Sequence, residues 1–190
     1  MKLALLTILA ATIPVFASQL SSGQNSATMQ SPQNPATQLD GQDLQRITGE
    51  VRHQLVLLPY YGVFDNLAYR VSGDGTVTLE GQVTRPTLKS DAENVVKKIE
   101  GVDRVDNQIQ VLPPSPADER IRMATYRAIY GNDVLSSYAP RAVPPIHIIV
   151  NNGNVTLEGV VNRSMDKQVA DTQAKSVPGV FSVTDHLRVE

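Results

Sequence analysis

The chain has 190 residues, no cysteine and a nearly balanced charge, with 17 basic and 19 acidic side chains. This length suits one ordinary domain or two small ones, and the charge balance excludes a general attraction to nucleic acid. Without cysteine there are no disulfides, thiolate metal sites or thiol nucleophiles, so each domain must be stabilised by buried apolar surface. Aromatic residues make up only 5% of the chain, and we expect no cofactor.

The first seventeen residues are predicted to be an export signal. Lys2 gives a positive start, residues 3–15 are mostly apolar, and Ala17 ends a small-residue cleavage site. The apolar run is too short to cross a bilayer, which favours a cleaved signal over a membrane span; the alternatives are a buried helix or a retained anchor. We therefore expect a periplasmic protein that is soluble after cleavage.

Residues 18–41 are predicted to form a disordered linker. They are rich in Gln, Ser, Asn, Thr and Pro and contain few large apolar side chains. Such a segment buries too little surface to offset the loss of chain entropy, so a tether is the simplest role for it.

The rest of the chain repeats itself at an offset of 78 residues. The stretch 71–83 corresponds to 149–161, and the correspondence continues without a gap through Gly101 and Gly179 to the last apolar positions, Val111 and Val189. A fixed offset over so long a stretch indicates a duplicated structural unit. We expect a first module at 42–112, a Pro-rich linker at 113–116 and a second module at 117–190.

The first module is predicted to have the order α-β-β-α-β. Apolar residues at helical spacing predict a helix over 44–58, and alternating residues predict strands over 67–71 and 77–83 around a tight turn. Residues 90–93 have the sequence of a capping box that opens a second helix, which we expect Gly101 to end. A last strand follows over 105–111.

The second module repeats this order, with a first helix predicted over 118–130 and a longer, proline-containing loop after it. The predicted fold class is α+β. Each module is expected to be a three-stranded mixed sheet packed against two helices.

The strand motif V-T-L-x-G-x-V, followed by a helix and by G-V-x-x-V-x-N/D with two further apolar residues, resembles the BON domain. The matching residues in the first module are Val77, Thr78, Leu79, Gly81, Val83, Gly101, Val102, Val105, Asn107, Ile109 and Val111. Those in the second are Val155, Thr156, Leu157, Gly159, Val161, Gly179, Val180, Val183, Asp185, Leu187 and Val189.

The resemblance implies a tandem module of periplasmic and outer-membrane proteins, linked to envelope integrity and osmotic stress, with phospholipid binding as the activity usually proposed. It supplies no catalytic residues, and we expect no enzymatic activity. The four shared glycines are expected to be structural: Gly81 and Gly159 allow close backbone approach, and Gly101 and Gly179 cap helices.

No catalytic or metal-binding motif stands out in the sequence. His53, His147 and His186 lack a second ligand-type residue at metal-binding spacing, and no nucleophile elbow or phosphate loop occurs. We therefore predict neither a catalytic site nor a metal site.

The first helix of the second module differs from its counterpart, because it has a second apolar stripe. Met123, Tyr126 and Tyr130 form that stripe, and it is flanked by Arg120, Arg122 and Arg127. One interpretation is that the stripe packs against the first module. Another is a membrane-surface site in which the arginines pair with anionic phospholipid. A partner protein or peptidoglycan is the third.

The loops after the two first helices are a further candidate for binding. They carry Tyr60 and Tyr138 among other aromatic and proline residues, as contact loops often do. The alternative is that these rings close the ends of the cores. The sequence thus favours an exported protein that binds anionic phospholipid, with an envelope adaptor or an accessory domain of an enzyme as alternatives.

Overall fold

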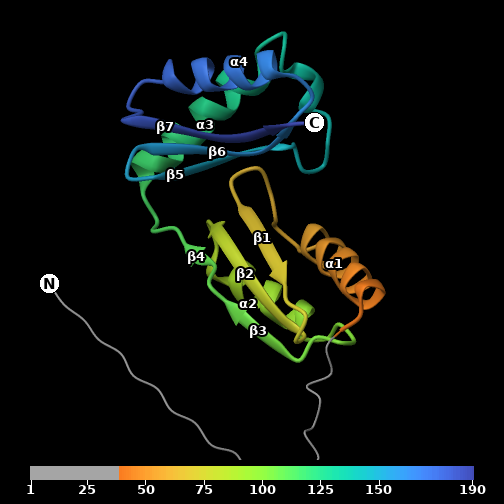
Figure 1. Ribbon diagram of the computed structural model, residues 1–190. Helices are drawn as coiled ribbons and strands as arrows, with labels where there is room; N and C mark the ends of the chain where they lie inside the picture. Colours follow the sequence, from red (N-terminus) through yellow and green to blue (C-terminus); the bar gives the residue numbers. More distant parts are fainter. Residues whose placement is uncertain (1–38) are drawn as a thin grey trace, which may run out of the picture. The chain divides into compact units, whose positions relative to one another are not determined.

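The computed structural model describes residues 39–190, so the predicted signal peptide and most of the predicted linker lie outside the described residues. Two copies of one order of elements follow each other along the chain (Figure 1). The first copy comprises α1 (Gly41–Val56), β1 (Asn66–Val71), β2 (Thr76–Val83), α2 (Pro86–Val96), β3 (Arg104–Asn107) and β4 (Gln110–Val111). The second comprises α3 (Pro116–Tyr130), the short 3-10 helix η1 (Ser136–Tyr138), β5 (Ile146–Asn151), β6 (Asn154–Val161), α4 (Ser164–Lys175) and β7 (Ser182–Val189).

Each copy contains a mixed sheet with the predicted topology. β1 and β2 are antiparallel, and the returning strands β3 and β4 run parallel to β2. In the second copy β5 and β6 are antiparallel and β7 runs parallel to β6. The last strand of the first module was predicted as one element, but it is divided into β3 and β4. The α+β class and the α-β-β-α-β order are confirmed.

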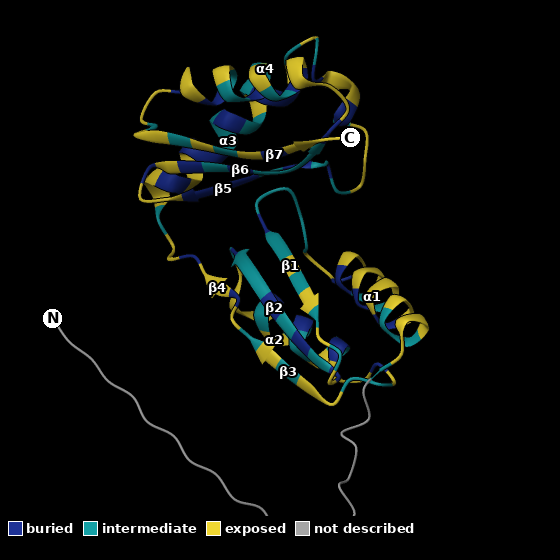
Figure 2. Cartoon of the chain, in the orientation of Figure 1, coloured by how far each residue is buried: buried dark blue, intermediate teal, exposed yellow. Residues whose placement is uncertain are grey.

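Each module has its own hydrophobic core. In the first, Ile47 and Val51 of α1 are fully buried together with Val77 and Leu79 of β2 and Ala92 of α2. The second core has the same plan, with α3 and α4 packed on the inward face of its sheet. Figure 2 shows the result as buried positions in the sheets and exposed stripes along α1 and α4. The helical spacing in the sequence therefore identified the inward faces correctly.

The glycines in the middle strands permit a very close backbone approach, as predicted. Gly81 has φ +114°, and a Cβ built on it would lie 2.1 Å from the carbonyl oxygen of Asn66. Gly159 has φ +126°, and its Cβ would lie 1.9 Å from the carbonyl oxygen of Pro145. No side chain fits at such distances, so both positions require glycine.

The second helix of the first module begins earlier than predicted. α2 starts at Pro86, whose fixed φ suits the first helical position, so the capping-box interpretation of Ser90 was wrong. Ser90 lies inside the helix, where its hydroxyl donates to the carbonyl of Pro86 (3.3 Å). The earlier start adds Leu88 to the buried face.

The glycines after α2 and α4 adopt the predicted left-handed conformation but do not cap these helices. Gly101 and Gly179 have φ +88° and +90°, whereas α2 ends at Val96 and α4 at Lys175. Both glycines instead turn the chain toward the last strand. A Cβ on Gly101 would lie 2.9 Å from Cδ1 of Ile47, so this turn packs directly against α1.

Ordered structure extends into both predicted linkers. The side chain of Asp40 accepts bonds from the amides of Gln42 and Asp43 and so caps α1, although the disordered linker was expected to continue to Gly41. The amide of Leu39 donates to the carbonyl of Gly73 (2.9 Å). At the second linker, Ser115 caps α3 and Pro116 is its first residue.

Candidate functional site

The predicted face of α3 is divided between exposed and buried side chains. Arg120 and Arg127 are exposed, and Met123 and Tyr126 are half-buried. Arg122 and Tyr130 are only 4% and 6% exposed, so the expectation that they contact a membrane does not fit their burial. Only part of this face is therefore available to a partner.

Arg122 and Tyr130 are buried because they bond to the neighbouring strand β5. A guanidinium nitrogen of Arg122 donates to the carbonyl of Val150 (2.8 Å) and another contacts Glu119 (3.1 Å). The hydroxyl of Tyr130 donates to the carbonyl of Ile146 (2.7 Å) and accepts from the amide of the same residue (3.1 Å). These polar groups satisfy backbone atoms inside the module.

Tyr126, the middle residue of the apolar stripe, contacts the first module. Its ring meets that of Phe64 edge-on, with centroids 6.1 Å apart, and lies 4.9 Å from the ring of Tyr130. Phe64 belongs to the loop 61–65 between α1 and β1, and Val63 and Phe64 pack against the core of the second module. For this half of the stripe, the structure favours packing between modules over a free surface.

The same loop follows the outer edge of β5. The amide of Ile148 donates to the carbonyl of Val63 (2.8 Å), and the ring of Tyr61 stacks on His147, with centroids 5.7 Å apart. Burial lowers the pKa of His147, and burial raises the pKa of Tyr61 to about 12. Both rings are therefore uncharged at neutral pH. The helical and strand patterns of the sequence contain no signal for this contact, because it joins a loop to a strand edge.

Tyr138, the second loop tyrosine, is a core residue and is 3% exposed. Its hydroxyl donates to Asp166 (2.7 Å) and accepts from the amide of Asn162 (2.9 Å). Burial raises the pKa of Asp166, but the hydrogen bonds from Tyr138 and Arg163 and the charge of Arg163 outweigh it, so this pKa is lowered. Tyr138 thus fits the alternative interpretation, in which it closes the core.

Tyr60 is the loop tyrosine that remains exposed, and it lies beside two other exposed apolar residues. Val56, Leu57 and Tyr60, at the carboxyl end of α1, are 51%, 63% and 72% exposed, and we call them the α1 patch. Sequence reasoning missed Val56 and Leu57, although both lie outside the apolar stripe that faces the core. Contiguous exposed apolar side chains of this kind mark interaction sites.

Basic side chains border the α1 patch. Arg52 and His53 each lie one helical turn before a patch residue, Val56 and Leu57 respectively. The guanidinium of Arg85 lies 4.7 Å above the ring of Tyr60. Tyr60 has φ +68°, a left-handed conformation that costs a non-glycine residue about 1–3 kcal/mol. The chain therefore holds an exposed aromatic ring in a strained position next to positive charge.

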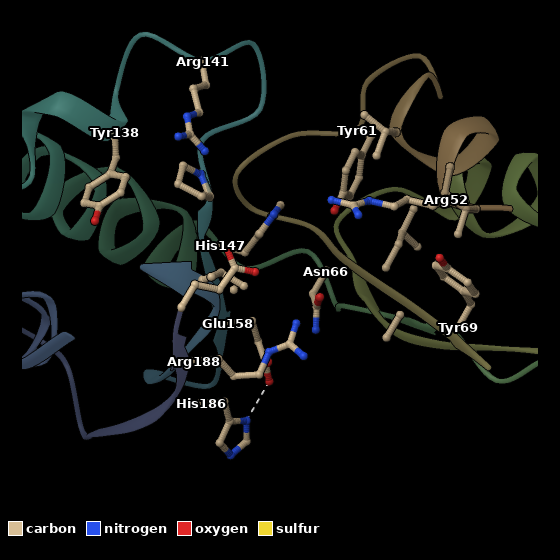
Figure 3. A pocket seen from close by; sticks show the side chains of 18 of the residues that line it. Arg52, Tyr61, Asn66, Tyr69, Tyr138, Arg141, His147, Glu158, His186 and Arg188 are labelled. Atoms are coloured by element: carbon tan, nitrogen blue, oxygen red, sulfur yellow. Dashed lines mark hydrogen bonds and ion pairs between the residues drawn. The ribbon is translucent and has the colours of Figure 1, made fainter. Parts of the chain in front are cut away.

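A cleft of about 870 Å³ lies close to this patch and is lined by both modules (Figure 3). Arg52 of α1, Arg141 of the loop before β5 and Arg188 of β7 contribute guanidinium groups to its walls. Tyr61, Tyr69 and Tyr138 also line it, and Glu158 contacts His186 there (2.7 Å). The cleft brings together residues that sequence analysis did not connect, because Arg52 and Arg188 are 136 positions apart.

Within residues 39–190, no group of three or more His, Cys, Asp or Glu side chains is arranged to hold a metal ion. Over the same residues, no helix combines the length and the apolar character needed to cross a membrane. The α1 patch, the remaining α3 face and the arginine-lined cleft are thus the candidate binding surfaces of the described part, although isolated apolar side chains such as Phe181 are also exposed.

These features define a class of protein built from tandem α-β-β-α-β modules, each with its own core. The chain belongs to the BON-domain family, whose model matches residues 43–113 and again residues 118–190. The predicted tandem BON architecture is therefore confirmed. BON domains are non-catalytic binding domains that are known in phospholipid-binding envelope and osmotic-stress proteins.

Solved structures similar to this chain include two of CdsD, a structural protein of the type III secretion system of Chlamydia trachomatis. The first is 13% identical, with a TM-score of 0.28, and the match covers 76% of this chain and 92% of that one. The second, the C-terminal domain, is 12% identical, with a TM-score of 0.27, and the match covers 75% and 96%. The comparison with curated proteins gave no match.

Proposed function

We propose that this protein is a non-enzymatic periplasmic protein that binds the surface of anionic phospholipid membranes and so supports envelope integrity or osmotic stress tolerance. The observation that carries the proposal is the α1 patch with Arg52 and Arg85 beside it. Apolar and aromatic side chains enter the headgroup layer of a bilayer, and neighbouring arginines pair with lipid phosphates. The family's phospholipid-binding members support the same activity.

The location of this membrane contact differs from the one expected from the sequence. Tyr126 and Tyr130 are engaged inside the protein, which leaves Arg120, Met123 and Arg127 as the accessible part of the α3 face. The α1 patch offers three apolar side chains that are each more than half exposed. We therefore assign the main contact to the first module, with the exposed arginines of α3 as a supporting charge.

The test is co-sedimentation of the chain without its predicted signal peptide with vesicles. Vesicles of phosphatidylcholine alone are compared with vesicles that also contain phosphatidylglycerol, at low and at physiological salt. We expect binding only to the anionic vesicles, and weaker binding as salt rises, because exposed charges are screened beyond about 8 Å at physiological ionic strength.

A double variant, Leu57→Glu with Tyr60→Asn, tests the patch itself. It places a negative charge in the patch, and asparagine tolerates the left-handed backbone at position 60. We expect vesicle binding to fall about tenfold or more, since burying a charge in a membrane interface is costly. Met165→Glu is the matched control, because Met165 is 61% exposed but lies outside the patch.

Absence of binding to every vesicle would reject the membrane proposal and favour a protein or cell-wall partner. Equal loss of binding in the control would reject the α1 patch as the contact site. The double variant Met123→Glu with Tyr126→Glu is less informative, because Tyr126 also contacts Phe64.

A further inference from the structure

The cleft described above has an unusual supply of positive charge. Arg52, Arg141 and Arg188 all line it, and none of them forms an ion pair with a residue that the structure describes. By contrast, Arg46, Arg70, Arg122 and Arg163 each have a carboxylate partner. Unpaired guanidinium groups collected in one cavity point to an anionic ligand.

The two acidic side chains in the cleft offset part of this charge and leave the arginines in excess. Among the described lining residues the acidic ones are Glu158 and Glu190, and Glu158 contacts Nδ1 of His186 (2.7 Å). Figure 3 shows Arg141 on one side of the cleft, Arg52 on the other, and Arg188 near Glu158. The walls of the cleft therefore carry guanidinium groups from three separate elements.

Neutral hydrogen-bonding groups complete the lining. Asn66 and Asn162 line the cleft with the phenol of Tyr61. Because burial raises the pKa of Tyr61 to about 12, its hydroxyl keeps its proton and can donate to an anion. Guanidinium forks match the oxygens of a phosphate group, so this lining suits a charged headgroup better than an acyl chain.

The cleft is continuous with the α1 patch. Val56 belongs to the patch and also lines the cleft, and Arg52 lies one helical turn before it. A lipid whose headgroup phosphate occupied the cleft would thus lie beside the apolar side chains that we assign to the membrane interface.

We propose that this cleft is a binding site for a phosphate group, carried either by a phospholipid headgroup or by a soluble phosphate ester. Only the lipid form of this inference rests on the proposed function. The phosphate chemistry is independent of it, because it depends on the three arginines and not on the patch.

The first experiment titrates the chain without its predicted signal peptide with sn-glycerol 3-phosphate at constant ionic strength, with chloride as the reference anion. The readout is the set of arginine Nε–H signals in an NMR spectrum. We expect the signals of Arg52, Arg141 and Arg188 to shift together along one saturable curve. Absence of a saturable shift would overturn the proposal.

Two variants and a control locate the site. Arg141→Gln and Arg188→Gln each remove a cleft cation without touching the α1 patch, and we expect about tenfold weaker binding, as for loss of one charge-assisted hydrogen bond. Arg104→Gln removes an exposed arginine of β3 that does not line the cleft, and its affinity should be unchanged. If all three variants lost the same affinity, the binding would depend on the net charge of the protein alone. That result would overturn the proposed site.

Vesicle binding by the same variants identifies the source of the phosphate. If Arg141→Gln and Arg188→Gln weaken binding to both the soluble ester and anionic vesicles, the occupant is a lipid headgroup. If they weaken only binding of the ester, the occupant is a soluble phosphate ester. The patch variant Leu57→Glu with Tyr60→Asn should still bind the ester, so failure of the membrane proposal is separable from failure of the cleft.

Discussion

The loops that follow the first helices of the two modules place leucine and tyrosine side chains in opposite environments. Leu57 and Tyr60, at the end of α1, are 63% and 72% exposed, whereas Leu135 and Tyr138, in the loop after α3, are 0% and 3% exposed. The two loops differ in length, because nine residues (57–65) separate α1 from β1 and fifteen (131–145) separate α3 from β5. The longer loop folds its leucine and tyrosine into the core, and the shorter one leaves them at the surface.

The backbone amide that follows the middle strand has a different partner in each module. In the first module the amide of Thr84 donates to the carboxylate of Asp65 (2.7 Å). In the second, the corresponding amide of Asn162 donates to the hydroxyl of Tyr138 (2.9 Å). A buried amide needs a partner, so the module that lacks the aspartate uses its tyrosine. Where Asp65 provides the bond, no tyrosine is needed at this amide, and Tyr60 is exposed.

The largest difference in stability change between the modules is expected when Leu57 and Leu135 are each replaced by alanine. Leu135→Ala leaves a cavity in a packed core and should lower the free energy of unfolding of the second module by about 2–5 kcal/mol. Leu57→Ala removes an exposed side chain and should change the stability of the first module by less than about 0.5 kcal/mol. Urea unfolding followed by amide NMR signals of each module measures both values. Similar losses at the two positions would show that the modules do not differ in this way.

A smaller difference is expected for the two tyrosine hydroxyls. Tyr138→Phe leaves the amide of Asn162 without a partner and removes the shorter of two hydrogen bonds to Oδ2 of Asp166, which should destabilise the second module by about 1–3 kcal/mol. Tyr60→Phe removes an exposed hydroxyl and should leave the melting temperature of the first module unchanged. Thermal unfolding of the two variants provides the comparison, and a neutral Tyr138→Phe would contradict the role given to this hydroxyl.

The smallest effect concerns the contact between the modules, and we expect the stability of that contact to depend on pH. Burial lowers the pKa of His147, although the carbonyls of Asp65 and Gly62 and the carboxylates of Asp65 and Glu158 raise it. If the loop 61–65 detached from β5, the pKa of His147 would return to its ordinary value of 6.5, so the detached state takes up a proton first as the pH falls. The contact between the loop and β5 is therefore fully stable above pH 6.5 and weakens below it.

Hydrogen exchange of the Ile148 amide measures this weakening. Between about pH 7.5 and about pH 5.5 we expect its protection, corrected for intrinsic exchange, to decrease, as for a buried histidine that must be charged. His147→Asn should abolish the pH dependence, whereas His53→Asn, which changes an exposed histidine of α1, should preserve it. Protection that is independent of pH in the unmodified protein would contradict the argument.

Much of the fold could be predicted because the repeat gives each pattern twice. The stretch from Val77 to Val83 and its copy, with glycines at positions 81 and 159, identified the middle strands and their close approach. The start of α2 was missed because Ser90 and Glu93 match a capping box inside the helix, while Pro86 is the true signal. Local patterns cannot rank two competing helix starts.

The binding surface was harder to predict than the fold. Periodicity shows which side of a helix is apolar, but it does not show what covers that side. The apolar stripe of α3 is largely covered by Phe64 and by β5, and Tyr138 is buried by its bonds to Asp166 and Asn162. The burial of the α3 stripe and that of Tyr138 both depend on chain segments far away in the sequence.

The bond between Val63 and Ile148 has a consequence for solubility. β5 is an edge strand of its sheet, and an open edge strand is a template on which another chain can add a strand and start aggregation. The loop 61–65 occupies this edge and engages the amide of Ile148. The first module thus shields its neighbour from intermolecular strand pairing, and a second module produced alone would expose a β-strand edge rich in isoleucine and valine.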